Sequence, residues 1–246
     1  MTIRVGVGGW TYEPWRGVFY PEGLAQKREL EYAAQRLTAI EINATYYGRQ
    51  KPQSWRNWAA AVPDGFQFSV KASRYCTQRK VLAESGDSIR MFLEQGFTAL
   101  GDKLGPINWQ LADGKKFDRD EFARFLDLIP DAQGGVPLRH ALEVRDASFT
   151  DSAFLDLARA RNMAVVFADD DEFPCIEEQT ADFTYARLQG AIEQVETGYD
   201  PAAIEGVAQQ ARAWAKGGRD VFVYFISGAK VRNPAAAQAL IAGLEL

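Results

Sequence analysis

The chain has 246 residues, 47% of them hydrophobic, and a formal net charge of -5 at pH 7. This length allows one sizeable core or two small ones, and the acidic balance excludes a protein whose whole surface coats nucleic acid. No apolar run reaches the roughly 20 residues of a membrane span, and MTIRVGVGG lacks the long apolar stretch of a secretion signal, so we expect a cytoplasmic protein with no membrane partner.

Short β-rich runs alternate with helical patterns along the whole chain, and no linker divides them. Eight runs have strand character, and they begin at Arg4, Ala39, Phe66, Leu104, His140, Ala164, Phe183 and Val221. Eight β/α units in this length predict an α/β fold, a (β/α)8 TIM-type barrel, as a single domain over residues 1–246. The alternative is an open doubly wound sheet, although GVGGW fails the dinucleotide-binding fingerprint because Thr11 replaces its third glycine.

Several segments between these runs carry the start signals of helices. Asp118 is predicted to cap RDEFARFLDLIP, with Glu121 at the capping-box position. The pairs Asp200-Pro201 and Asn233-Pro234 each predict the start of a further helix. The segment DEFPCIEEQTAD, residues 171–182, is too short and irregular to predict one.

Polar residues occupy one face of several predicted strands, since successive side chains of a strand point to opposite sides. In AIEINAT, Ile40 and Ile42 oppose Glu41, Asn43 and Thr45. In a barrel the apolar set covers the helices, so the polar set faces the axis. We therefore expect these polar side chains to converge on the axis: Glu41, Asn43, Lys71, Glu143, Arg145, Arg187 and Gln189.

The five charged members of this set need partners, because an unpaired buried charge costs several kcal/mol by rough estimate. Lys71, Arg145 and Arg187 exceed Glu41 and Glu143 by one positive charge, which a bound anion would balance. The alternative is an ion-pair network that only fills the barrel. Several of these residues lie near the C-terminal ends of their strands, where barrel enzymes build their sites, and this favours a ligand site.

Aromatic and basic residues also share the loops at these strand ends. Trp10, Tyr12 and Tyr46 are candidate contacts for a sugar or base joined to phosphate, although a plug of the barrel mouth is the better explanation for any one aromatic taken alone. The last loop, SGAKVRNP, places cations before a helix start, where backbone amides suit phosphate. Its candidate residues are Ser227, Gly228, Lys230 and Arg232.

The only histidine, His140, begins its predicted strand and therefore lies at the end of the barrel away from the site. This excludes a Ser-His-Asp triad, a Cys-His pair and a histidine-rich zinc cluster. Cys76 and Cys175 form no CxxC pair, so neither a disulfide framework nor a zinc ribbon is predicted.

Proton transfer is the chemistry that the converging residues permit. Glu41 and Glu143 are candidate base and acid, and Lys71, with its pKa lowered between Arg145 and Arg187, is the other candidate. The same cations compete with a metal ion for the carboxylates, so we expect no metal and no other cofactor.

Seven blocks of the sequence, GVGGWTYEPWRGVFYP, IEINATYY, FQFSVKAS, LGPINWQL, LEVRDASF, YARLQG and VFVYF, resemble in this order the bacterial YecE-like family, domain of unknown function 72. The resemblance spans nearly the whole chain and implies a TIM-type barrel, but no activity, because none is established for the family. The family carries histidine where this chain has Asp146 and Gln189, and after the lysine of the third block. The resemblance thus implies a divergent member.

The leading hypothesis is a metal-independent enzyme, a hydrolase or lyase, that acts on a small phosphorylated or otherwise anionic substrate at the C-terminal barrel mouth. Its catalytic residues are predicted to be Glu41, Glu143 and Lys71, and its substrate-binding residues Asn43, Arg145, Arg187, Gln189, Trp10, Tyr12 and Tyr46.

The less favoured alternative is a non-catalytic protein that binds a nucleotide or single-stranded nucleic acid. It would use Tyr46, Tyr47, Arg74, Arg79 and Lys80. A third hypothesis is a scaffold for protein partners whose internal charges are purely structural.

Overall fold

The computed structural model describes residues 2–170 and 172–246, in which nine strand segments form one parallel sheet. Along the sheet the order is β8-β7-β4-β3-β2-β1-β11-β10-β9. The segments are β1 (Ile3–Gly8), β2 (Ala39–Ile42), β3 (Gln67–Lys71), β4 (Leu104–Gln110), β7 (His140–Glu143), β8 (Ala164–Val165), β9 (Phe167–Asp169), β10 (Phe183–Leu188) and β11 (Asp220–Phe225). A separate antiparallel pair consists of β5 (Ala132–Gln133) and β6 (Val136–Pro137).

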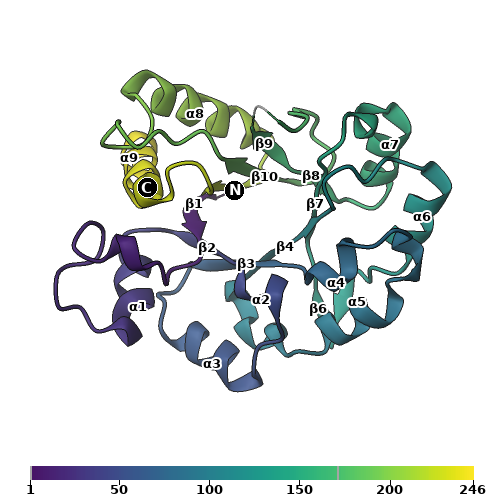
Figure 1. Cartoon of the computed structure of the whole chain (residues 1–246), viewed down its shortest axis with the longest axis horizontal. Coiled ribbons are helices and arrows are strands. Elements are labelled where there is room, and N and C mark those ends of the chain that lie inside the picture. Colours follow the sequence, from purple (N-terminus) through teal and green to yellow (C-terminus); the bar gives the residue numbers. More distant parts are fainter. Residues whose placement is uncertain (1, 171) are drawn as a thin grey trace.

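The two ends of this sheet meet, because β8 and β9 are consecutive parts of one predicted strand with only Val166 between them. β8 pairs with β7, β9 pairs with β10, and the amide of Val166 donates to the carbonyl of Leu142 at 3.0 Å. The sheet therefore closes into a barrel, and Figure 1 shows the strands around its centre with the helices outside. The predicted TIM-type α/β fold is confirmed.

Helices follow most of the barrel strands, and the longer ones lie on the outside of the barrel (Figure 1). They are α1 (Glu29–Ala34), α2 (Ala44–Tyr47), α3 (Pro52–Ala60), α4 (Arg74–Thr77), α5 (Gly86–Leu93), α6 (Arg119–Asp127), α7 (Ser152–Ala160), α8 (Pro201–Trp214) and α9 (Asn233–Leu244). Short 3-10 helices cover η1 (Glu13–Trp15), η2 (Gln26–Arg28), η3 (Leu82–Glu84), η4 (Phe97–Lys103), η5 (Ala147–Thr150) and η6 (Lys230–Arg232). After β9, residues 172–182 contain neither helix nor strand, which agrees with the irregular sequence there.

The predicted helix starts are confirmed, with one difference in detail. The Asp118 carboxylate accepts a hydrogen bond from the amide of Glu121 at 2.8 Å, and that of Asp200 accepts one from Ala203 at 2.9 Å. Glu121 does not complete a capping box. Its carboxylate instead accepts hydrogen bonds from the Lys115 ammonium and from the amide of Leu82, so it ties α6 to the preceding loops.

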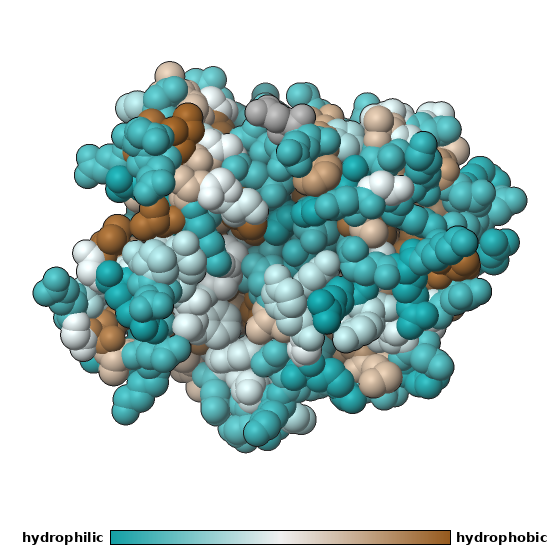
Figure 2. All heavy atoms as spheres, viewed as in Figure 1, coloured by the Kyte–Doolittle hydropathy of each residue, from teal (hydrophilic) through white to brown (hydrophobic). Residues whose placement is uncertain are grey.

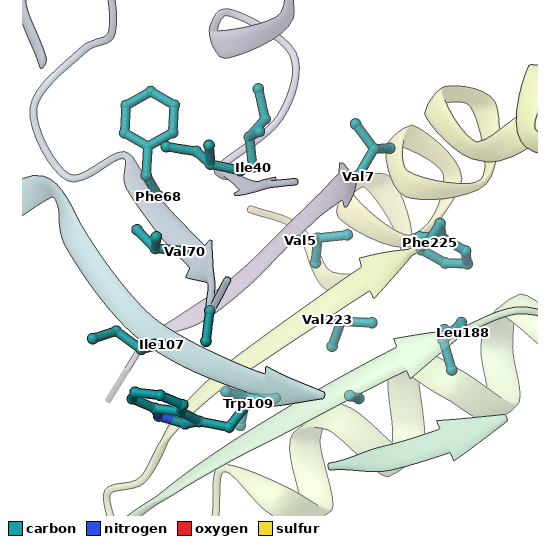
Figure 3. Close-up of a cluster of buried hydrophobic side chains, with 14 of the residues drawn as sticks. Val5, Val7, Ile40, Phe68, Val70, Ile107, Trp109, Leu188, Val223 and Phe225 are labelled. Carbon is teal, nitrogen blue, oxygen red and sulfur yellow. The ribbon is translucent and has the colours of Figure 1, made fainter. Parts of the chain in front are cut away.

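Apolar side chains pack on both sides of the barrel wall and form two separate clusters. The outer cluster lies between the strands and the helices, and Figure 3 shows its members leaving successive strands, among them Val7, Ile40, Val70, Val223 and Phe225. Ile40 is one of the apolar positions of the predicted alternation, and all five residues are fully buried. The opposite faces of the same strands are thereby turned to the barrel axis.

The inner cluster combines large rings on one side of the barrel with small residues on the other. Phe183, Tyr185, Phe222 and Tyr224 come from β10 and β11 and face alanines such as Ala39, Ala141 and Ala164 from the other strands. Gly6 of β1 has no room for a side chain, since a Cβ added to it would lie 1.8 Å from the carbonyl oxygen of Ala39. Rings thus fill the barrel from the amino ends of its strands to their middles, and polar residues occupy the carboxyl ends.

The face of the molecule in Figure 2 is mostly hydrophilic. Figure 2 shows hydrophilic residues over most of the visible face, with hydrophobic residues in small separate groups. Within the described residues, none of the helices combines the length and the apolar character that crossing a membrane requires. Cys76 and Cys175 are both free thiols.

Candidate functional site

A cavity of about 440 Å³ opens at the carboxyl ends of the strands. Four cationic side chains line it, Lys71, Arg145, Arg187 and Lys230, and no Asp or Glu is among its described lining residues. The other lining residues are Gly8, Gly9, Trp10, Thr11, Ile42, Asn43, Ala44, Tyr47, Gln110, Ile226, Ser227 and Asn233. The cavity is therefore electropositive and lies where barrel enzymes bind their substrates.

Beneath the cavity, one guanidinium joins two buried carboxylates. Arg187 donates from Nη1 to Glu143 at 2.6 Å and from Nη2 to Glu41 at 3.2 Å. The three residues are at most 2% exposed. Because the two donors of the guanidinium point in fixed directions, this bridge sets the separation of the carboxylates and holds Arg187 at the floor of the cavity.

Neutral donors complete the coordination of both carboxylates. The amide of Asn108 donates to Glu143 at 2.9 Å and to Glu41 at 3.3 Å, and the Tyr185 hydroxyl donates to Glu41 at 2.6 Å. Burial alone would raise the pKa of Glu143, but the charges of Arg187, Lys71 and Arg145 and the Asn108 hydrogen bond outweigh it and lower this pKa to about 2. Glu143 is thus held as a carboxylate.

Lys71 ends β3 and presents its ammonium to the cavity from a side chain that is mostly buried. Its Nζ lies 4.5 Å from the centre of the Tyr46 ring, and no carboxylate oxygen of the described residues lies within 4.0 Å of it. Burial, reinforced by the charge of Arg187, lowers the pKa of Lys71 to about 8 despite the opposing effect of Glu41 and Glu143. Lys71 is therefore a cation whose charge is incompletely neutralised.

Arg145 follows β7 and is paired more fully than the sequence suggested. It donates to Asp113 at 2.7 Å and to Glu143 at 3.3 Å, and its guanidinium lies 4.6 Å from the centre of the Phe173 ring. The expected surplus of one positive charge did not include Asp113, because that residue lies in the loop after β4. The Asp113 side chain is 70% exposed, however, so the surplus on the cavity side is only partly offset.

The loop after β11 contributes the fourth cation. Lys230 lies with its Nζ 4.3 Å from the centre of the Tyr12 ring, and partial burial lowers its pKa. The carbonyl of Lys230 accepts a hydrogen bond from the Trp15 indole at 2.8 Å, which fixes this loop on the first one. Tyr12 thus supports the cation and is not itself among the lining residues, whereas Trp10 is.

The strand predicted over AIEINAT is wrong in its second half. β2 ends at Ile42, and Asn43 has helical backbone angles and precedes α2. Asn43 still lines the cavity, but Thr45 does not: its hydroxyl donates to the carbonyl of Lys71 at 2.6 Å and ties α2 to the end of β3. Alternation therefore accounts for the direction of Glu41 and does not apply to Asn43 and Thr45, which lie beyond the strand.

Two other residues predicted to bind substrate lie outside the lining. Tyr46 contacts the site only through the ring that lies against Lys71. Gln189 follows β10, and its buried Nε2 has no hydrogen-bond partner within the described residues. In the first loop, Trp15 and Phe19 are buried against each other with ring centres 5.9 Å apart, so they form core and not a ligand surface.

Sequence reasoning missed Asn108, Gln110 and Tyr185. The amide of Gln110 donates to Glu143 at 2.6 Å, so β4 supplies two of the donors that hold this carboxylate. The signal was present, because Ile107 and Trp109 alternate with these two amides to the end of the strand. Alternation also places Tyr185 on the axis face, two residues before Arg187, but it does not predict the hydrogen bond of its hydroxyl to Glu41.

In the part of the chain that the structure describes, the side chains that could act as metal ligands are not arranged as a metal site. Within the described residues, no group of three or more His, Cys, Asp or Glu side chains is arranged to hold a metal ion. Glu41 and Glu143 are occupied by the guanidinium and by the neutral donors, which leaves few free lone pairs for a cation. His140 is buried at the start of β7, where its Nδ1 accepts a hydrogen bond from the Trp109 indole at 3.1 Å.

The sequence profile described as "Protein of unknown function DUF72" matches residues 4–246. The chain belongs to this family. The YecE-like family that the sequence blocks resemble is the same family, so that prediction is confirmed. No curated protein matches the chain.

Solved structures of other DUF72 proteins share the whole fold. The DUF72 protein of Thermotoga maritima is 22% identical, with a TM-score of 0.80 and 100% of both chains covered. That of Enterococcus faecalis is 18% identical, with a TM-score of 0.79, and 100% of this chain and 96% of the other are covered. A methyltransferase from Methanosarcina mazei is 12% identical, with a TM-score of 0.52, covering 98% of this chain and 94% of that one. At these identities the likenesses show the fold alone.

Proposed function

We propose that this DUF72 protein is a metal-independent enzyme, a hydrolase or lyase, that binds a small phosphorylated or otherwise anionic substrate in the cavity at the barrel mouth. The observation that carries the proposal is the lining itself, which holds Lys71, Arg145, Arg187 and Lys230 without a carboxylate among the described lining residues. Such a cavity attracts anions, and a volume of about 440 Å³ suits a small molecule.

Lys71 is the residue best suited to move a proton in this cavity. A pKa of about 8 lets it exchange a proton near neutral pH, which general acid-base catalysis requires. Glu143, with a pKa of about 2 and donors on both oxygens, is less suited to that role than the sequence implied. In this proposal Glu41 and Glu143 hold Arg187 in place, and Arg187, Arg145 and Lys230 bind the anion.

Anion binding is tested by a thermal-shift titration with inorganic phosphate, sulfate and pyrophosphate. A ligand at about a hundredfold excess over its dissociation constant stabilises by about 2.7 kcal/mol, which is a clear shift. Lys71→Met and Lys230→Met should weaken the response. Lys216→Met is the matched control, because Lys216 lies between α8 and β11, at the opposite end of the barrel. An equal response in all four proteins would contradict the proposed site.

Turnover is tested separately with a panel of phosphate esters and phosphorylated sugars, with products followed by phosphorus NMR. We expect one compound class to be converted by the wild type, equally well in the presence of a metal chelator, and much more slowly by Lys71→Met. Activity that is unchanged in Lys71→Met would remove Lys71 from the mechanism.

The second candidate function is non-catalytic binding of a nucleotide or single-stranded nucleic acid, and exposed rings in the loops after β2 and β3 favour it. Tyr47 is 68% exposed and Tyr75 is 58% exposed, and the guanidinium of Arg74 lies 5.3 Å from the centre of the Tyr75 ring. Bases stack on such rings without sequence preference. An affinity for short oligonucleotides that falls steeply with salt, without product formation, would favour this function over the first.

A further inference from the structure

The surroundings of Lys71 suit an amine that reacts with a substrate as well as one that binds it. The side chain is 9% exposed, and its nitrogen faces the cavity next to the Tyr46 ring. No carboxylate of the described residues lies close enough to form an ion pair with it. A lysine that is desolvated beside another cation, as Lys71 is beside Arg187, loses its proton readily and becomes nucleophilic.

We propose that Lys71 forms an imine with a small aldehyde or ketone that carries a phosphate or another anionic group. This inference rests on the proposed function, because it assumes that the cavity binds an anion, and it names the substrate class and the reacting atom. The uncharged amine adds to the carbonyl carbon as the π bond of the carbonyl breaks toward oxygen, and the two protons of the amine are transferred to that oxygen. Loss of that oxygen as one water molecule leaves the carbon doubly bonded to Nζ, and a proton from solvent gives the cationic imine.

The geometry of the cavity supports two separate positions for the two ends of such a substrate. Lys71 is on β3, whereas Lys230, Ser227 and Asn233 belong to the loop after β11 and the start of α9. An anionic group at Lys230 would leave the carbonyl free to reach Lys71. Asn233 is 2% exposed and its Oδ1 has no partner within the described residues, so it offers an acceptor to a substrate hydroxyl.

An imine at this position would also give the protein the chemistry of a lyase. The cationic imine withdraws electrons from the bonds at the neighbouring carbon and so weakens them. At pH 7 about a tenth of a lysine with a pKa of about 8 is in the reactive uncharged form, and this fraction rises with pH. The rate of imine formation should therefore increase between pH 6 and pH 8 by on the order of tenfold or more.

The experiment is reductive trapping with two probes, glycolaldehyde phosphate and dihydroxyacetone phosphate. Borohydride delivers hydride to the imine carbon and leaves a stable secondary amine, which intact mass and peptide mapping locate. We expect a single adduct on Lys71 at a low excess of probe, formed more slowly when inorganic phosphate competes. Lys71→Arg, which keeps the positive charge, should give no adduct at this position, and uncharged glycolaldehyde should react at least tenfold more slowly.

The outcome separates the inference from the function on which it rests, because phosphate binding is measured in parallel by thermal shift on the same samples. A phosphate response without any adduct on Lys71 would overturn the imine and leave the anion site standing. Adducts spread over surface lysines, at the same rate in wild type and in Lys71→Arg, would likewise overturn it. Absence of both the response and the adduct would overturn the inference and the proposed function together.

Discussion

Arg187 donates to Glu143 at 2.6 Å and to Glu41 at 3.2 Å, so a single guanidinium spans the barrel between β2 and β7. Within the described residues, Glu41 otherwise accepts hydrogen bonds only from the neutral donors Asn108 and Tyr185, whereas Glu143 also accepts one from Arg145 at 3.3 Å. The bridge therefore stabilises the barrel at the carboxyl ends of its strands and fixes the positions of the side chains at the floor of the cavity.

Replacement of Arg187 by Met should lower the free energy of unfolding by about 3–5 kcal/mol, because two buried carboxylates then lose their shared partner. Arg187→Lys keeps the charge but not the two directed donors, so it should lie between wild type and Arg187→Met. Urea denaturation gives both values. If adding Glu41→Gln and Glu143→Gln to Arg187→Met recovered none of the loss, the explanation by unpaired carboxylates would be wrong.

The lowered pKa of Glu143 predicts that the free energy of unfolding falls as the pH drops below about 4.3. Its pKa is about 2 in the folded protein and about 4.3 in an unfolded chain, so the unfolded state binds more protons between these values. The contribution of Glu143 is therefore fully present above about pH 4.3 and is lost as the pH falls toward 2. Glu143→Gln should flatten the fall in stability over this window, as followed by denaturant midpoints at several pH values. If stability fell as steeply in Glu143→Gln as in wild type, Glu143 would not be the group responsible.

Strand periodicity was sufficient to predict the barrel and the direction of Glu41, Lys71 and Arg187. These residues lie inside regular strands, where alternation is enforced by the backbone. It failed at Asn43, because the chain leaves the extended conformation after Ile42 and a period of two no longer applies. The loop residues that complete the site were therefore beyond the reach of this rule.

Partners that come from distant loops could not be predicted from the sequence either. Asp113 pairs with Arg145 across 32 positions, and Lys230 lies on Tyr12 only because the first and last loops are neighbours in the closed barrel. Such pairs depend on the closure of the sheet and leave no local pattern. Asn108 is different, since alternation within β4 would have found it had the rule been applied there.

Asn108 should be more important for stability than an ordinary amide, because its single Nδ2 serves both carboxylates. Asn108→Asp keeps the shape but replaces a donor by a third carboxylate, so we expect a loss of several kcal/mol at neutral pH, on the order of a broken buried pair, and a smaller loss at pH 4. Asn108→Ala should cost about 1–3 kcal/mol at either pH. Thermal melts at the two pH values distinguish these patterns, and equal losses for Asn108→Asp at both would contradict the electrostatic explanation.

Gly6 is predicted to be intolerant of any side chain. A Cβ there would lie 1.8 Å from the carbonyl oxygen of Ala39, and neither strand can move without opening the sheet. Gly6→Ala should therefore destabilise by about 3 kcal/mol or more. Gly206→Ala is the control, because Gly206 lies in α8 with open space around it and alanine there should stabilise by about 0.5–1 kcal/mol. Similar melting temperatures for the two variants would contradict this packing.

Replacement of Lys71 distinguishes a functional site from a structural ion-pair network. The first interpretation predicts a higher melting temperature for Lys71→Met, and the second predicts a lower one. Its pKa is about 8 in the folded protein and about 10.4 in an unfolded chain, so the unfolded state binds more protons between these values and stability rises with pH there. Below about pH 8 the charged amine is a net cost to the fold. Lys71→Met should then raise the melting temperature at pH 7, by an amount equivalent to about 1–3 kcal/mol, and weaken the response to phosphate.

This gain from Lys71→Met should shrink as the pH rises toward 10.4, because wild-type Lys71 then loses the charge that burial penalises. Melting curves of both proteins at pH 7 and at pH 10 measure the difference, with Lys216→Met as the control for a general effect of removing a lysine. A scaffold with purely structural charges predicts a lower melting temperature for Lys71→Met at both pH values and no change in ligand response. We expect that a destabilising charge is kept in a cavity because it serves a ligand. The melting curves of wild type and Lys71→Met at the two pH values test this expectation.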